Sequence, residues 1–317
     1  MMNLSYNLSA ELKENLQKVE TLRRVILLTP ISSQFKLRFR WEAMLERIYW
    51  SLSDKSISKK DLIGLFTKQE KKNLTEIEKE LLNYKKALDY ISQNWLVSRK
   101  AVTLKTILTL HEIACRQTLR KSIGNLFRIN EVPLRQIMDY IQTGTEHAVI
   151  QSGIAYIQVV NISPFTEGNR RVGRLLSYLF LYKSGYDFDR YLVLERFLGE
   201  DKEVVAKHMQ EAIRSRNLTV WLEYFSRELT TQLEKIKADL ESVRFRIELP
   251  VFFLQLNERQ KTILTWLEQP DISLTNRDVQ KRYKVSQITA SRDLVKLVNL
   301  GLLYPHGKGR SVSYTKA

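Results

Sequence analysis

Apolar residues recur at helical spacing along most of the chain. In the first hundred residues they stand three or four positions apart, as in 12–22 and 62–66. The segment 74–91 reads as a charged amphipathic helix, and Thr75 followed by two glutamates is typical of a helix start. The pattern therefore predicts an N-terminal helical region over residues 1–100.

The most apolar segments lie between residues 101 and 228. The stretches 104–113 and 150–160 repeat apolar positions at helical spacing. The stretch 171–182 is apolar almost all round after its first turn, which is typical of a helix in the centre of a bundle. We expect a helical core over 101–228.

A four-three spacing of apolar residues follows, from Leu229 to Ile247. Two interpretations stay open: a helix packed on its own domain, or a helix that forms a homodimer or acts as a spacer. Pro250 ends the pattern, so 229–250 is predicted as a connecting helix.

The last segment, 251–317, predicts three helices and a hairpin. Thr275 and Ser286 stand at expected starts of the second and third helices, and Gly301 ends the third. Strands are expected at 302–304 and 311–314. The residues expected to point inward from the third helix are Ile288, Ala290, Leu294, Leu297 and Val298.

Composition limits the class of protein. The chain has 317 residues, enough for about two domains at roughly 150 residues each. Only 11 Gly and 6 Pro occur, which argues against a many-stranded sandwich. The one cysteine, Cys115, excludes an intrachain disulfide and a cysteine-based zinc site. The absence of a long apolar stretch or a signal-peptide core predicts a cytoplasmic protein with no membrane partner.

Charge gives the first indication of function. Lys and Arg number 51 against 35 Asp and Glu, so the net charge is +16 and the pI about 9.7. Residues 251–317 carry eleven Lys or Arg and five Asp or Glu, a local net charge of +6. Such an excess favours polyanionic partners, such as nucleic acid or nucleotide phosphates.

The segment 163–174 has the pattern of a phosphate site. Gly168 and Asn169 form a turn at a helix start, where free backbone N–H groups suit an anion. Arg171 and Arg174 stand three apart, on one face of that helix. Glu167 could hold a divalent cation that bridges phosphates. The alternative is an arginine-rich helix start that only faces solvent.

This segment resembles the signature of the Fic family, His-Pro-Phe-x-Asp/Glu-Gly-Asn-Gly-Arg-x-x-Arg. Further segments similar to that family are Leu108–His111, Gly124–Arg128, Ser184–Tyr186 and Trp221–Phe225, so the resemblance covers roughly 30–230. The positions that match the signature itself are Pro164, Phe165, Glu167, Gly168, Asn169, Arg171 and Arg174.

The resemblance implies an all-α fold, a Fic-type helical bundle, and transfer of AMP from ATP to a protein hydroxyl. It implies Mg²⁺ and ATP as cofactors. Glu167 then binds Mg²⁺, and Gly168 and Asn169 form the anion hole. Arg171 and Arg174 hold the phosphates. Arg170 stands where the family has glycine and either crowds the phosphates or adds a donor.

The sequence departs from the family at the proton acceptor. Ser163 stands at the position of the family's histidine, and a neutral hydroxyl is a poor base near pH 7. The loss of a general base costs roughly 10²–10⁴-fold in rate. His111 and His147 could reach the motif only through the fold. The stretch between Arg128 and Pro133 is also short, so we expect the family's hairpin flap to be largely missing there.

A second departure lies in the segment 29–40, which resembles a degenerate inhibitory helix of the family. Lys36 stands where the family has a glutamate, so it is expected to repel Arg174. In the other alignment that we considered, Glu42 or Glu46 takes that place. If Lys36 occupies the glutamate position, the general base and the inhibitory glutamate are both absent from this chain.

The segment 251–317 resembles a winged helix-turn-helix, which implies a partner in double-stranded DNA. Such a domain places its third helix in the major groove and its wing on phosphates. The alternative is a winged helix used for protein contact. The residues expected to bind DNA are Ser286, Gln287, Thr289, Ser291, Arg292, Lys308 and Arg310.

The sequence therefore predicts a Fic-type helical bundle followed by a small α+β winged-helix domain. It predicts a DNA-binding regulator whose Fic domain keeps nucleotide binding and is impaired in AMP transfer. An active or altered Fic-type protein adenylyltransferase is the alternative. A scaffold without either activity is the third class.

Overall fold

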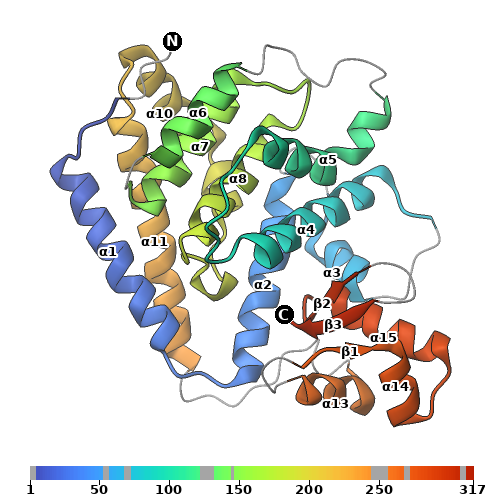
Figure 1. The fold of residues 1–317 in the computed structure, drawn as a ribbon. Coiled ribbons are helices and arrows are strands. Elements are labelled where there is room, and N and C mark those ends of the chain that lie inside the picture. Colours follow the sequence, from blue (N-terminus) through green and yellow to red (C-terminus); the bar gives the residue numbers. More distant parts are fainter. Residues whose placement is uncertain are drawn as a thin grey trace. The chain divides into compact units, whose positions relative to one another are not determined.

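The computed structural model describes residues 5–52, 57–67, 73–121, 132–143, 146–243, 256–267, 272–307 and 312–317. Within these ranges the chain is mostly helical, with one small antiparallel sheet (Figure 1). The predicted fold class, a helical bundle followed by a small α+β unit, is confirmed.

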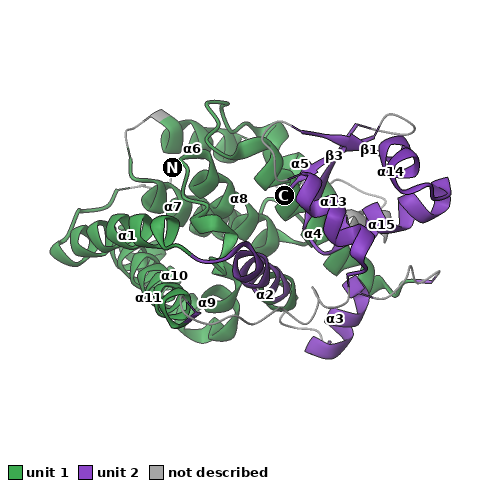
Figure 2. Ribbon diagram, turned by 90° about the horizontal axis from the view of Figure 1, so that it is seen from below, with its two compact units in different colours: residues 1–30, 46–56, 74–242 green, residues 31–45, 57–73, 243–317 purple. Residues whose placement is uncertain are grey.

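Contacts between residues divide the chain into two compact units (Figure 2). The first comprises residues 1–30, 46–56 and 74–242, and the second comprises residues 31–45, 57–73 and 243–317. Neither unit is one stretch of sequence. The four consecutive domains expected from the sequence stay predictions, because functional domains need not coincide with units defined by contacts.

The first unit is a helical bundle. Among the helices of the described residues, none combines the length and apolar character needed to cross a membrane. The elements of this unit are α1 (Ala10–Leu28), the end of α2 (Ser33–Ser51), α4 (Glu76–Trp95), α5 (Leu104–Lys121), α6 (Val132–Thr143), α7 (Ala148–Ile162), α8 (Asn169–Lys183), the 3₁₀ turn η1 (Phe188–Arg190), α9 (Leu194–Glu200), α10 (Lys202–Ser215) and α11 (Thr219–Val243).

Helices α7 and α8 form the centre of this bundle. Every residue from Val172 to Tyr182 is buried, because α4, α5 and α7 all contact α8. The hydroxyl of Ser177 donates to the backbone carbonyl of Ser152, 2.9 Å away, and ties the two helices together. The apolar pattern of 171–182 thus belongs to a central helix, as expected.

Helix α11 lies beside α1 in both views (Figures 1 and 2). The amide of Asn15 donates to the hydroxyl of Ser226, 3.1 Å away. Leu229, Leu233 and Leu240, three of the heptad-spaced residues, are buried within this single chain. This burial favours the interpretation in which that stretch packs on its own unit. The expected boundary at residue 229 falls inside one continuous helix.

The second unit combines short helices with the sheet. The sheet is antiparallel with strand order β1-β3-β2, and Leu274 pairs with Tyr314 while Leu303 pairs with Lys316. Its elements are the start of α2, α3 (Lys59–Thr67), α13 (Glu258–Trp266), β1 (Leu274–Thr275), α14 (Asn276–Tyr283), α15 (Gln287–Asn299), β2 (Leu303–His306) and β3 (Ser313–Lys316).

Side-chain caps fix where the helices of the second unit begin. The side chains of Asn257, Thr275 and Ser286 each accept a hydrogen bond from the backbone N–H three residues later. The expected starts of α14 and α15 are therefore confirmed. Ile288 is a correction: it was expected to point inward, but 64 % of it is exposed.

Candidate nucleotide and nucleic-acid sites

The motif occupies the turn between the two central helices of the first unit. Helix α7 ends at Ile162, and its C-cap residue Ser163 has a left-handed φ of 48°. Helix α8 begins after Gly168. The amide of Asn169 closes the turn, because its oxygen accepts from the N–H of Phe165 at 2.9 Å and its nitrogen donates to the carbonyl of the same residue at 2.8 Å. The side chain of Asn169 thus shapes the loop that a phosphate would approach.

Gly168 is required at its position for two reasons. Its φ is +85°, a conformation that side chains rarely adopt. A Cβ atom on Gly168 would also overlap the sulfur of Cys115 on α5. Burial raises the pKa of the Cys115 thiol to about 11, so this cysteine stays protonated and acts as a small packing residue rather than as a nucleophile.

His111 reaches the motif from α5. Its ring stacks on Phe165 with centroids 3.9 Å apart, and its Nε2 lies 3.0 Å from the carbonyl oxygen of Glu167. A carbonyl only accepts, so Nε2 carries the proton and donates it in this bond. Burial, aided by the charge of Arg171, lowers the pKa of His111. This histidine is therefore neutral and supports the loop.

Ser163 itself offers no proton acceptor of useful strength. Its hydroxyl donates to the carbonyl of Val160 at 2.7 Å, and its N–H donates to the carbonyl of Val159 at 3.0 Å. His147 caps the start of α7, whereas the motif follows the end of that helix. The imidazole of His147 lies 2.9 Å from a carboxylate oxygen of Glu20.

Glu167 presents an exposed side chain at the start of the turn that leads into α8. Among the described residues, no three His, Cys, Asp or Glu side chains gather as a metal site. Protein-bound Mg²⁺ commonly takes one or two carboxylates and completes its shell with phosphates and water. Glu167 therefore suits Mg²⁺ only in company with the phosphates of a nucleotide.

Arg171 forms an ion pair that the sequence analysis missed. Its Nη2 lies 3.1 Å from Oε2 of Glu80 on α4, and the two side chains are 17 % and 10 % exposed. Glu80 precedes the buried Tyr84 by four residues, so helical spacing alone places both on the buried face of α4. A glutamate on that apolar face was the signal available in the sequence.

Arg174 is buried, with only 4 % exposed. Its Nη2 donates to the carbonyl of Ser51 at 2.8 Å, and Ser51 is the last residue of α2. The carbonyls at a helix C-terminus carry partial negative charge, which suits a guanidinium. The Nε of Arg174 has no hydrogen-bond partner among the described residues.

This geometry corrects the expected partner of Arg174. The residue of α2 that accepts from Arg174 is Ser51 at its end, whereas Lys36 near its start was expected to face it. Glu42 and Glu46 were the alternative candidates for the inhibitory glutamate. In the structure, Glu42 pairs with Arg38 at 2.8 Å, and Glu46 accepts from the indole of Trp50 at 2.9 Å.

Arg170, at the family's glycine position, is exposed and lines a cavity of about 260 Å³. Lys202 lines the same cavity. Its aromatic and apolar lining includes Tyr156, Val160 and Met209. The cavity is smaller than the roughly 300–1,000 Å³ of typical ligand pockets. Its lining therefore combines two cations with an aromatic and apolar wall.

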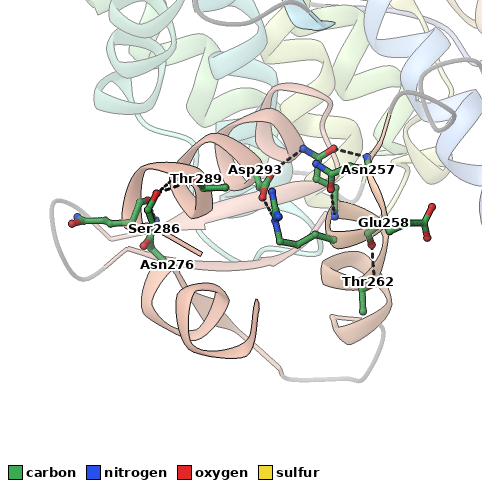
Figure 3. Close-up of polar contacts among 10 residues, drawn as sticks. Asn257, Glu258, Thr262, Asn276, Ser286, Thr289 and Asp293 are labelled. Atoms are coloured by element: carbon green, nitrogen blue, oxygen red, sulfur yellow. Dashed lines mark hydrogen bonds and ion pairs between the residues drawn. The ribbon is translucent and has the colours of Figure 1, made fainter. Parts of the chain in front are cut away.

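In the second unit, the turn between α14 and α15 is held by side-chain hydrogen bonds. The hydroxyl of Ser286 caps α15 and lies 3.0 Å from the hydroxyl of Thr289 (Figure 3). The amide of Asn276 on α14 donates to the hydroxyl of Ser291 at 2.8 Å. Among the predicted DNA-binding residues, Ser291 thus joins α15 to α14, whereas Ser286 and Thr289 hold the first turn of α15.

The remaining predicted DNA-binding residues differ in what the structure describes. Gln287 and Arg292 are exposed on α15. Lys308 and Arg310 lie outside the described residues. The segment Gly124–Arg128, which resembles a Fic-family element, also lies outside them, as do residues 128–131 of the expected flap.

Comparison with known proteins bears on the motif. The model of the Fic/DOC family matches residues 101–181, which run from the start of α5 almost to the end of α8. The chain carries a Fic/DOC family domain. This domain contains the whole loop around Gly168 and the His111 side chain that supports it.

Relatives of the Fic/DOC domain are distant. The chain is 27 % identical to "Protein adenylyltransferase Fic" of Drosophila grimshawi, over 34 % of this chain and 26 % of that protein, so it spans about a quarter of the curated relative. A Fic family protein from Desulfovibrio desulfuricans G20 has a similar fold, with a TM-score of 0.59 at 15 % identity over 99 % of this chain and 98 % of that one. A segment of Fic-1 from C. elegans gives a TM-score of 0.58 at 17 % identity over 74 % of both chains.

Proposed function

We propose that this protein is a DNA-binding regulator whose Fic/DOC domain binds a nucleotide as a ligand and is impaired in AMP transfer. The observation that carries the DNA-binding role is the distribution of charge on α14 and α15. On this helix pair, the exposed charged residues are all cations: Arg277, Lys281, Arg282, Lys284 and Arg292.

The two acidic residues of the same helix pair both accept hydrogen bonds from neighbouring side chains of this unit. The carboxylate of Asp278 accepts from the N–H and the hydroxyl of Thr275 in the cap of α14. Asp293 is buried and accepts from Arg259 and Gln260 of α13 (Figure 3). A surface whose exposed charges are cations, and whose two carboxylates already accept hydrogen bonds, favours a polyanionic partner.

The order of elements supports duplex DNA as that polyanion. Three helices with a strand between the first two, then a two-stranded hairpin, follow the order of a winged helix-turn-helix. The first residues of the third helix in such a domain contact base edges, and neighbouring cations contact phosphates. In this chain those first residues include Gln287, and Arg277 is among the cations.

Salt dependence tests the DNA-binding role. The full chain should bind a fluorescent duplex of mixed sequence with an affinity that falls linearly as salt rises on logarithmic axes. Arg277→Ala should weaken binding and reduce that slope by about one. Lys261→Ala is the matched control, because Lys261 already pairs with Glu258 on α13. Absent or salt-insensitive binding would contradict the proposal.

The impairment in AMP transfer rests on Ser163. A hydroxyl that donates to the Val160 carbonyl takes up no proton from a target hydroxyl near pH 7, and His111 already donates through its Nε2. Arg171 and Arg174 would still meet phosphates, with Glu167 holding Mg²⁺ alongside them. When bound, the ion would supply charge neutralisation at the phosphates.

The substitution Ser163→His tests the impairment. Histidine tolerates the left-handed conformation of this position better than most residues do. The wild-type chain should show little transfer of label from α-labelled ATP to protein, and Ser163→His should gain self-modification. Efficient transfer by the wild type would overturn the impairment. Calorimetry with ATP, with and without Mg²⁺, tests nucleotide binding separately.

The second candidate function is an active or altered Fic-type protein adenylyltransferase. The observation that favours it is the survival of Glu167, Arg171 and Arg174 in a chain similar to a protein adenylyltransferase. Our proposal also places the protein in the cytoplasm. A homodimer stays a prediction, to be tested by sedimentation.

A further inference from the structure

Ile288 lies at an unexpected place for a large apolar side chain. It is the second residue of α15, and 64 % of it is exposed. The other large aliphatic residues of that helix that face its core, Leu294 and Leu297, are fully buried. An isoleucine is therefore exposed to solvent at the N-terminal end of α15, the end that is expected to contact base edges.

Helix geometry explains this exposure. Ala290, Leu294 and Leu297 form the buried face of α15. Ile288 precedes Ala290 by two residues, which turns it about 200° away from that face. Arg292 follows Ile288 by four residues and is exposed on the same side.

The surroundings of Ile288 are polar. Ser286 and Gln287 precede it and are exposed, and Arg292 lies one turn further along. An apolar group flanked by hydrogen-bonding groups and a cation matches one feature of the major groove. There an A·T pair shows the methyl group of thymine beside the acceptors and donors of the base edges.

We infer that Ile288 contacts the C5 methyl group of a thymine in the major groove, so that α15 selects an A·T pair at one position of its binding sequence. The inference rests on the proposed binding of duplex DNA by this unit. The five exposed cations of α14 and α15 support DNA over a protein as the occupant, because DNA offers the opposite charge.

Uracil substitution isolates this contact, because deoxyuridine differs from thymidine only by the missing methyl group. A preferred duplex is first selected with the full chain from a pool of random-sequence DNA. Each thymine of that duplex is then replaced by uracil in turn, and affinity is measured for the wild type, Ile288→Ala and Ile288→Val. Arg277→Ala serves as the matched control on α14.

At one position, uracil should weaken wild-type binding about fourfold, the value of one buried methyl group. Ile288→Ala should bind the thymine and uracil duplexes equally, while Ile288→Val keeps part of the difference. Arg277→Ala should weaken both duplexes and leave their ratio as in the wild type.

Two results would overturn the inference. One is a duplex in which no thymine position discriminates, and the other is an unchanged ratio in Ile288→Ala. If that unchanged ratio came with altered self-association or protein binding, Ile288 would be a protein contact. Salt-dependent duplex binding in any of these cases would leave the proposed function standing. A failure to bind any duplex would remove both.

Discussion

The guanidinium of Arg171 and the carboxylate of Glu80 lie 3.1 Å apart, in a pair that is largely shielded from water. Arg171 is one of two motif arginines expected to meet phosphates. The other, Arg174, donates to the carbonyl of Ser51. A nucleotide that enters this site must therefore compete with groups of the chain itself.

The first prediction concerns Glu80→Gln. Removing the charge from one partner of this shielded pair should lower the free energy of unfolding by about 1–3 kcal/mol. It should also free Arg171, so ATP should raise the melting temperature more than it does in the wild type. Differential scanning fluorimetry measures both effects. Glu76→Gln is the control, because Glu76 lies on the same helix in an exposed pair with Lys79. An equal response to ATP in Glu80→Gln and wild type would show that Glu80 does not compete.

The second prediction concerns Gly168→Ala. The positive φ and the overlap with the sulfur of Cys115 should together cost about 2–4 kcal/mol in the free energy of unfolding. In the double variant with Cys115→Ala, the overlap should be relieved while the backbone strain stays. Urea denaturation of the wild type, both single variants and the double variant forms the cycle. Strictly additive costs would mean that the two positions do not touch.

The third prediction concerns pH and His111. Burial lowers the pKa of His111 below the ordinary value of 6.5. As pH falls below about 6.5, the unfolded chain takes up a proton that the folded chain refuses, so stability is lost on acidification and is fully present above that pH. Melting temperatures of wild type and His111→Gln, compared between about pH 7 and pH 5, should show a steeper loss in the wild type. His306→Gln, in the exposed part of β2, controls for removal of an imidazole as such. Parallel curves for wild type and His111→Gln would contradict the assignment.

The fourth prediction concerns the buried Asp293. It accepts from the amide of Gln260 at 2.7 Å and from the guanidinium of Arg259. Asp293→Ala leaves both donors without this acceptor and should cost the second unit about 3–5 kcal/mol. Hydrogen exchange over 256–317 should quicken and duplex binding should fall. Glu258→Ala removes an exposed acid and should change stability by about 0.5 kcal/mol or less. Unchanged exchange in Asp293→Ala would exclude a structural role for this carboxylate.

Local patterns in the sequence were sufficient for much of the fold. The helix caps at Thr75 and Ser286 could be predicted because each side chain accepts a hydrogen bond from the backbone N–H only three residues later. The central position of α8 followed from its apolar circumference. The inward position predicted for Ile288 was wrong, because Ile288 precedes the buried Ala290 by two residues and so points about 200° away from the buried face of α15.

The site was predictable in its loop and not in its partners. Gly168 and Asn169 form the start of α8 as the motif indicates. Arg171 and Arg174 stand on one helix three residues apart, yet their partners come from α4 and α2, at sequence separations of 91 and 123 residues. Such pairings depend on how the helices pack, which spacing along the chain does not encode.

Helix α2 has a consequence for regulation. Its first residues belong to the second unit, where Arg40 donates to the carbonyl of Ala317. Its final residue, Ser51, belongs to the first unit, where its carbonyl accepts from Arg174. A single rod of backbone thus ends at the guanidinium that a triphosphate would attract. An anion that drew Arg174 away from Ser51 would leave the last carbonyl of α2 without this donor. The C-terminal turn of α2 is therefore the part of that helix most exposed to a change in the state of the loop around Gly168.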